Sequence, residues 1–214
     1  MRIRTTHQFH AAIADEFAWR RKELLDFRLQ TRTKNFVLQP LFIRAGVPLA
    51  YAHWEGFVKA STEILLNYVA HLHLKNGQLT DVYFAHSAKT QIAKVVEGRR
   101  AVSVKEAACF LRDCSDLASE IRHKNYVDAE SNLSSVVFDQ IAGSIGVDTN
   151  AYKHMYPYID ETIVQQRNRI AHGESLSLSI DDFHSLTDKV AELMNMYKTD
   201  VENIVSLKSY QRSY

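Results

Sequence analysis

Apolar side chains recur at helical spacing through long, uninterrupted stretches of this chain. Between residues 6 and 31 they stand at Phe9, Ile13 and Phe17, with basic residues on the other side. This spacing places them on one face of an α-helix. Only 7 Gly and 3 Pro occur in 214 residues, which leaves few places for the tight turns of a many-stranded sheet. The sequence therefore predicts an all-α fold.

The length of 214 residues suits a single domain spanning 1–214, with residues 78–150 as a helical elaboration. Residues 31–46, around Pro40, are expected to form a packed loop or a short extended piece. Asn76-Gly77 is expected to end the second helix. The helices are predicted at residues 6–31, 47–75, 80–96, 104–121, 132 or 134 to about 143–146, 156–171 and 180–207.

Charge, cysteine usage and hydropathy narrow the class of protein. The net charge of +1 gives no global field for nucleic acid, so any RNA contact has to come from a local basic cleft. Cys109 and Cys114 are interpreted as reduced, small apolar residues of a cytosolic protein. No apolar run approaches the roughly 20 residues of a membrane span, and the start of the chain lacks a signal-peptide core. We expect a soluble, cytoplasmic protein without a membrane contact.

Several smaller signals have an ordinary structural interpretation. The basic runs 20–22, 99–100 and 122–124 are typical of solvated helix faces, although tyrosines near them would also suit an RNA groove by stacking on unpaired bases. These tyrosines are Tyr126, Tyr152 and Tyr156. The paired histidines near residues 7–10 and 71–73 lack a matching set of cysteines or carboxylates. No metal site and no cofactor are expected.

The stretch Gln165–Glu174 contains the residues suited to chemistry. Arg167 and His172 stand five positions apart, with Asn168 after the arginine and Gly173 after the histidine. Arginine keeps its charge and presents a planar fork of donors to phosphate oxygens. Histidine takes and returns protons near neutrality. These two groups suffice for metal-free RNA cleavage, since the ribose 2′-hydroxyl supplies the nucleophile.

The spacing of these two residues also predicts local structure. Positions five apart on an ideal helix are rotated by about 140°, so Arg167 and His172 do not share a face. They can converge on one phosphate if His172 lies at the end of the helix. Gly173 supplies such an end.

The motif, with its polar residue after Arg167 and its glycine after His172, resembles the Arg-x4–6-His motif of HEPN-domain ribonucleases. Upstream, the stretch Arg44–Lys59 resembles the second helix of prokaryotic HEPN-like nucleases of defence and toxin–antitoxin loci. With the start of the chain and the run Trp19–Leu25, the likeness covers most of the sequence. It implies a HEPN-like antiparallel helical bundle with extra helices between the second helix and the motif helix.

The resemblance also implies roles for the motif residues. His172 would act as acid or base at the 2′-hydroxyl or the leaving 5′-oxygen, and Arg167 would stabilise charge on the phosphate in the transition state. Asn168 would bond the phosphate or orient the histidine. The products would be a 2′,3′-cyclic phosphate and a 5′-hydroxyl, formed without a metal. Two protomers would join their motifs in one composite cleft, so we expect a homodimer.

Three further residues are candidates for supporting this site. Glu55 lies on an otherwise apolar helix face, where a buried carboxylate needs a partner. Lys59 stands one turn further along the same rim. Glu174 stands where HEPN toxins silenced by nucleotidylation carry a tyrosine, so that mode of silencing is not expected. Each of the three also has a plain interpretation as surface or loop polarity.

Three functions remain open at this point. The first is a metal-independent endoribonuclease, acting as a toxin or anti-phage effector with RNA as its substrate and with a possible cognate antitoxin or defence-system partner. The second is a non-catalytic HEPN-type module that binds nucleotide or RNA or serves as an adaptor. The third is an antitoxin-like structural partner. The complete set of Arg167, Asn168 and His172 favours the first.

Overall fold

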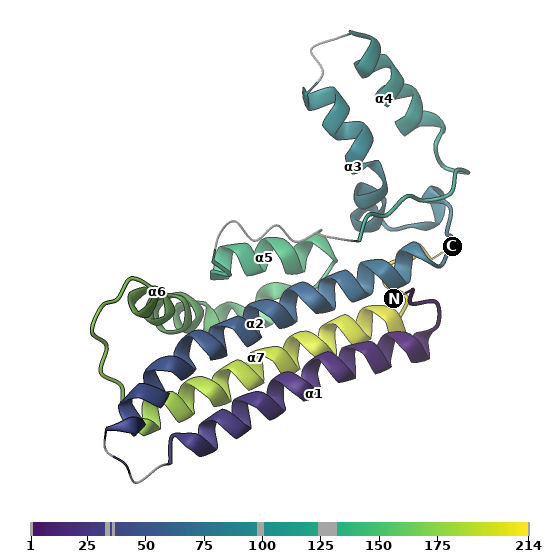
Figure 1. The fold of residues 1–214 in the computed structure, drawn as a ribbon. Helices are drawn as coiled ribbons and strands as arrows, with labels where there is room; N and C mark the ends of the chain where they lie inside the picture. The colour runs from purple at the N-terminus through teal and green to yellow at the C-terminus, as the bar shows by residue number, and fades with distance from the viewer. Residues whose placement is uncertain (1, 33–34, 36, 98–100, 124–131, 214) are drawn as a thin grey trace.

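Three long helices form the body of the protein, in a computed structural model that describes residues 2–32, 35, 37–97, 101–123 and 132–213. Helices α1 (Thr6–Gln30), α2 (Leu38–Ala70) and α7 (Ile180–Ser206) lie side by side, and α1 runs opposite to the other two (Figure 1). No strand occurs within the described ranges, and the all-α prediction is confirmed. The fully buried residues of the three helices include Phe9, Ile13, Trp54, Phe57, Leu65, Val190, Leu193 and Tyr197.

Capping side chains fix the beginnings of α1 and α7 where the sequence predicted them. The Thr5 hydroxyl accepts a hydrogen bond from the backbone N–H of Gln8 (3.1 Å). Ser179 and Asp182 cap α7 reciprocally, each side chain accepting the backbone N–H of the other residue. Such caps satisfy backbone donors that have no partner inside the helix.

Helix α2 begins at Leu38, so the prediction of a loop or extended piece over residues 31–46 is wrong from that residue onward. The helix continues through Pro48 because the turns before this residue bury Ile43 and Val47, which offsets the hydrogen bond that a proline removes. The three helices approach closely here. A Cβ on Gly46 would lie 2.4 Å from Cζ of Phe183.

The end of α2 also differs from the prediction. The helix stops at Ala70, and the left-handed residue after it is His73 (φ 53°) rather than Gly77. Asn76 is buried and pairs with another segment: its backbone N–H donates to the carbonyl of Leu117 (2.9 Å) and its Nδ2 donates to the carbonyl of Cys114 (3.1 Å). These tertiary hydrogen bonds override the local tendency of Asn-Gly to end a helix.

Helices α3 (Asp81–Glu97) and α4 (Ala101–Asp113) form a hairpin that projects from one end of the bundle (Figure 1). Helix α4 was predicted to continue to residue 121. It ends earlier because residues 114–119 leave the helical path and hydrogen-bond to residues 74–77. The C-terminal tail pairs with the base of the hairpin, where the backbone N–H of Thr80 donates to the carbonyl of Tyr210 (3.0 Å).

The chain then returns along α2 through shorter helical pieces. Instead of the single helix predicted over 156–171, a π-helix precedes a short α-helix, and π-helical turns are frequent at functional sites. The π-helix and the short α-helix after it both lie against α2. In chain order, this returning segment consists of α5 (Ser135–Ser144), the 3₁₀-helix η2 (Thr149–Met155), the π-helix η3 (Tyr158–Val164) and α6 (Gln165–Ala171). A 3₁₀ turn, η1 (Asn76–Gln78), precedes α3.

Two of the smaller sequence signals are corrected. Arg20 is not on a solvated face: it is 7% exposed, and its guanidinium lies over Trp19 and next to Gly56, whose missing side chain leaves it room. Tyr152 is fully buried and cannot stack on a base, whereas Tyr156 is partly exposed. Residues 99–100, 124 and 126, for which solvated faces or base stacking were predicted, lie outside the described residues. No helix in the described part of the chain has the length and apolar character to cross a membrane.

Candidate active site

The motif occupies α6 and the turn that ends it. His172 is the C-terminal cap, and its backbone N–H donates to the carbonyl of Asn168 (2.9 Å). Gly173 follows in the left-handed region (φ 78°) and donates to the carbonyl of Ile170, while Glu174 donates to that of Arg169. These two bonds form a Schellman motif, which needs a residue that tolerates positive φ. The helix end predicted at Gly173 is therefore present, and the His172 side chain is exposed there.

Arg167 is held by two amide side chains. Its Nη1 donates to Oδ1 of Asn132 (2.7 Å) and to Oδ1 of Asn168 (2.8 Å). The two amides also bond each other, Nδ2 of Asn132 donating to Oδ1 of Asn168 (3.1 Å). The guanidinium lies over the ring of Tyr51 on α2, with Cζ 4.8 Å from the ring centroid. A cation in this position is attracted by the negative face of the ring.

The segment that carries Asn132 is attached to both α2 and η3. The backbone N–H of Leu133 donates to the Tyr51 hydroxyl (2.8 Å). Asp160 on η3 accepts the backbone N–H of Ser135 (2.7 Å) and its hydroxyl (2.5 Å). A carboxylate at the start of α5 also interacts favourably with the positive end of that helix. These contacts place Asn132 beside a motif that follows it by 35 residues.

Glu55 reaches this cluster through Tyr51, one turn earlier on α2. Burial together with the negatively charged neighbour Glu55 raises the pKa of Tyr51 well above its ordinary value. Glu55 also pairs with Lys59, and both side chains are mostly buried. Glu55 thus lies next to the tyrosine that supports Arg167, and Lys59 is joined to Glu55. Among the described residues, neither of these two side chains has a hydrogen bond or ion pair with Arg167.

Glu174 and His172 lie in the turn that ends α6. Glu174 pairs with Arg169, at 3.0 Å between Oε2 and Nε. Within the described chain no hydrogen bond joins the side chain of His172 to another residue or to the cluster around Arg167. One protomer therefore presents a fixed arginine and a separate, exposed imidazole.

Sequence reasoning missed two members of the cluster. The helical spacing of Tyr51 among apolar residues indicates only a buried position, although its spacing of four from Glu55 is a signal for a hydroxyl–carboxylate contact on one helix face. Asn132 was considered only as a helix start. Nothing in its local sequence indicates a contact with a motif so far along the chain.

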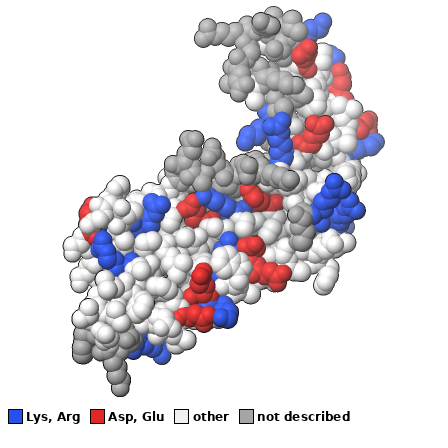
Figure 2. All heavy atoms as spheres, in the orientation of Figure 1, with Lys and Arg blue, Asp and Glu red and all other residues white. Residues whose placement is uncertain are grey.

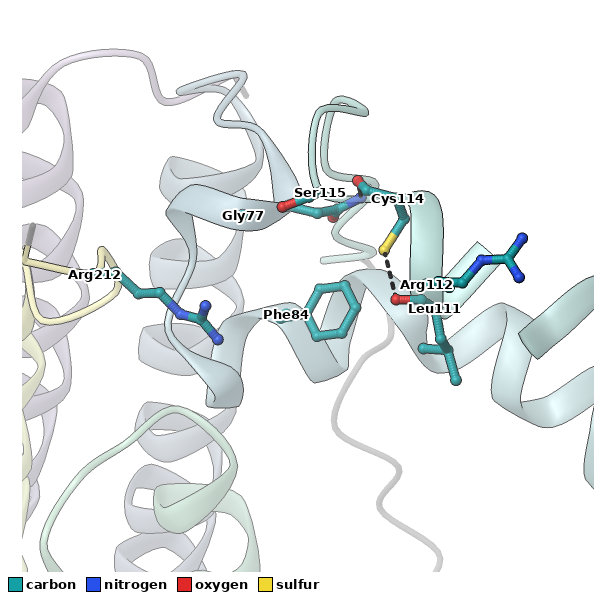
Figure 3. A pocket seen from close by; sticks show the side chains of 8 residues that line it. Gly77, Phe84, Leu111, Arg112, Cys114, Ser115 and Arg212 are labelled. Carbon is teal, nitrogen blue, oxygen red and sulfur yellow. Dashed lines mark hydrogen bonds between the residues drawn. The ribbon is translucent and has the colours of Figure 1, made fainter. Parts of the chain in front are cut away.

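Surface charge and a pocket outside this cluster offer no further candidate residues. Figure 2 shows basic and acidic side chains interspersed on the face drawn, without one broad basic field. A pocket of about 200 Å³ lies at the base of the α3–α4 hairpin, lined in part by Phe84, Cys114 and two arginines (Figure 3). Both arginines already have acidic partners, Arg112 in Asp113 and Arg212 in Asp81.

Comparison with known protein families agrees with the all-α fold. The family model described as RiboL-PSP-HEPN matches residues 15–203, which include the C-terminal part of α1, all of α2 and α6, and nearly all of α7. No curated protein and no solved structure matches the chain. Since the family model matches most of the 214 residues, the chain is a HEPN-domain protein and belongs to the RiboL-PSP-HEPN family.

Proposed function

We propose that this protein is a metal-independent endoribonuclease. HEPN domains include ribonucleases as well as non-catalytic members. The observation that carries the proposal is the fixed guanidinium of Arg167, held by two amides over Tyr51 and followed by an exposed histidine at the helix end. A purely structural helix end does not require a cation fixed in this way.

The reaction needs no nucleophile from the protein. The ribose 2′-oxygen attacks the adjacent phosphorus, the bond from phosphorus to the 5′-oxygen breaks, and the products carry a 2′,3′-cyclic phosphate and a 5′-hydroxyl. A base takes the proton from the 2′-hydroxyl and an acid gives one to the 5′-oxygen. In the proposal His172 supplies this proton transfer. Arg167 stabilises the negative charge that increases on the phosphate oxygens in the transition state.

A homodimer would complete the site. In-line attack places the base and the acid on opposite sides of the phosphorus, and the cluster around Arg167 contains no histidine. A second copy of the chain brings a second His172, and two-fold symmetry brings both to one cleft. On the basis of the resemblance we place the protein among toxin or anti-phage effectors of the cytoplasm, with RNA as the substrate.

A non-catalytic binding module is the second candidate. The observation in its favour is that the His172 side chain has no hydrogen bond to orient it within the described chain, whereas Arg167 is fixed. A site with a fixed cation alone binds phosphate without cleaving it.

Cleavage of total RNA by purified protein in EDTA separates the two. The variants are His172→Ala and Arg167→Ala, with His154→Ala and Arg112→Ala as matched exposed controls. We expect fragments with 2′,3′-cyclic phosphate ends from the wild type and both controls, and none from the motif variants while light scattering shows an unchanged dimer. RNA binding without cleavage would support the binding module. Cleavage that survives both motif substitutions, or that requires a divalent metal, would reject the proposed mechanism.

A further inference from the structure

The contacts of Arg167 use one corner of its guanidinium. Both amide oxygens, one from Asn132 and one from Asn168, accept from Nη1, and Nη1 carries two protons. The bond between the two amides closes a triangle around that nitrogen. Rotation of the guanidinium about its last bonds would break two hydrogen bonds, so the triangle fixes the direction in which the remaining donors point.

The remaining donors form the opposite edge of the guanidinium. Among the described residues neither Nε nor Nη2 of Arg167 has a hydrogen-bond partner. These two nitrogens carry parallel N–H bonds on one side of the plane, which is the geometry that takes two oxygens of one phosphate. The ring of Tyr51 lies against one face of the guanidinium rather than against this edge.

We propose that Asn132 is a positioning residue, which fixes Arg167 so that its Nε–Nη2 edge binds both non-bridging oxygens of an RNA phosphodiester. This inference rests on the proposed function, because it specifies how the same site takes its substrate. It assigns a role to a residue outside the motif, and one that the sequence alone did not indicate.

The attachment of Asn132 supports this role. Asn132 is followed by Leu133 and Ser135, both buried, and each is held by a hydrogen bond to α2 or η3. The backbone that follows Asn132 is therefore held by contacts that do not involve Arg167. The shorter side chain of Asn132 therefore positions the longer and more flexible side chain of Arg167.

A double-mutant cycle distinguishes positioning from a general structural role. The proteins are the wild type, Asn132→Ala, Arg167→Lys and the double variant. Lysine keeps the charge but has no fork of parallel donors to fix. Asn195→Ala, at an exposed asparagine on α7, is the matched control.

The probe is a short single-stranded 2′-O-methyl RNA of mixed sequence, which cannot be cleaved because its 2′-oxygen is blocked. Fluorescence anisotropy measures its Kd. We expect Asn132→Ala to weaken binding about 3- to 10-fold, the effect of one lost hydrogen bond on a charged group that is partly exposed. In the Arg167→Lys background the same substitution is expected to change the Kd by less than about 2-fold, since the fork it positions is gone. With cleavable RNA, Asn132→Ala should lower kcat as well.

Other results would overturn the inference. Asn132→Ala binding like the wild type, equal effects in both backgrounds, or a wild type that does not bind the probe would each reject it. A wild type that binds the probe with the expected non-additivity but cuts no RNA would reject the proposed catalysis while leaving the positioning role intact. Melting temperatures of all variants identify any loss that comes from unfolding.

Discussion

The hydroxyl of Tyr51 accepts the backbone N–H of Leu133 at 2.8 Å, while its ring lies under the guanidinium of Arg167. One side chain of α2 therefore supports the motif arginine and also anchors the segment that brings Asn132 to it. The ring and the hydroxyl make separable contributions, because one acts through its face and the other through hydrogen bonds.

Substitutions at Tyr51 test this separation. Tyr51→Phe keeps the ring and removes the hydroxyl, which leaves the buried N–H of Leu133 without its partner, so we expect a loss of about 1–2 kcal/mol in the free energy of unfolding. Tyr51→Leu also removes the aromatic face, so we expect this variant to cleave RNA about tenfold more slowly than Tyr51→Phe does. Urea denaturation and initial cleavage rates measure the two effects. Equal cleavage by the two variants would show that the ring face is unimportant.

Removal of the Asp160 carboxylate is expected to release the start of α5. Asp160 accepts two hydrogen bonds from Ser135, and bonds to a charged acceptor are stronger than neutral ones. We expect Asp160→Ala to destabilise the protein by about 2–3 kcal/mol and to reduce cleavage through displacement of Asn132. Ser135→Ala removes only the hydroxyl bond and serves as the milder control. Urea denaturation measures both, and an Asp160→Ala protein as stable as the wild type contradicts the prediction.

The sequence predicts the long elements of this fold well because their signals are local. The apolar periodicity of α1 and α7 and their capping residues Thr5 and Ser179 define those helices with little help from the rest of the chain. The Arg167–His172 motif and its helix end at Gly173 are likewise contained within a few residues.

The predictions fail in segments whose structure depends on contacts between residues far apart in the sequence. Helix α2 starts early because burial of Ile43 and Val47 outweighs the presence of Pro48. Asn76 does not end α2 because its hydrogen bonds go to the segment after α4. Asn132 reaches Arg167 only through the folded path of the chain. A local pattern contains no information on any of these pairings.

Gly173 offers a test of the helix end at the motif. Its φ of 78° is unfavourable for residues with a side chain, yet a Cβ there would meet no atom within 4 Å. Gly173→Ala is therefore expected to lose stability through backbone strain alone, by about 1 kcal/mol. It should also lower RNA cleavage by shifting the adjacent His172. Gly173→Asn, which tolerates the left-handed region better, should recover part of both losses. Cleavage by Gly173→Ala at the wild-type rate would contradict a requirement for this turn.

Two buried histidines predict how stability depends on pH. Burial lowers the pKa of His53, between α1 and α2, and of His86 on α3, below the ordinary value of 6.5. The unfolded chain therefore binds protons more readily than the folded one. Stability is fully present above about pH 6.5 and is lost as the pH falls below it, by at most about 1.4 kcal/mol per pH unit for each group.

The measurement is the urea midpoint at about pH 7.5, 6.5 and 5.5, with the slope of the transition recorded to verify that it is unchanged. We expect a clear decrease between the two lower values. His53→Gln places a side chain that does not titrate at the α1–α2 interface and should reduce that decrease, although it lowers stability at every pH. An exposed histidine is not transferred out of water on folding, so His154→Ala should keep the wild-type profile. A wild-type midpoint that stays constant down to pH 5.5 would show that both imidazoles accept protons in the folded state as easily as in water.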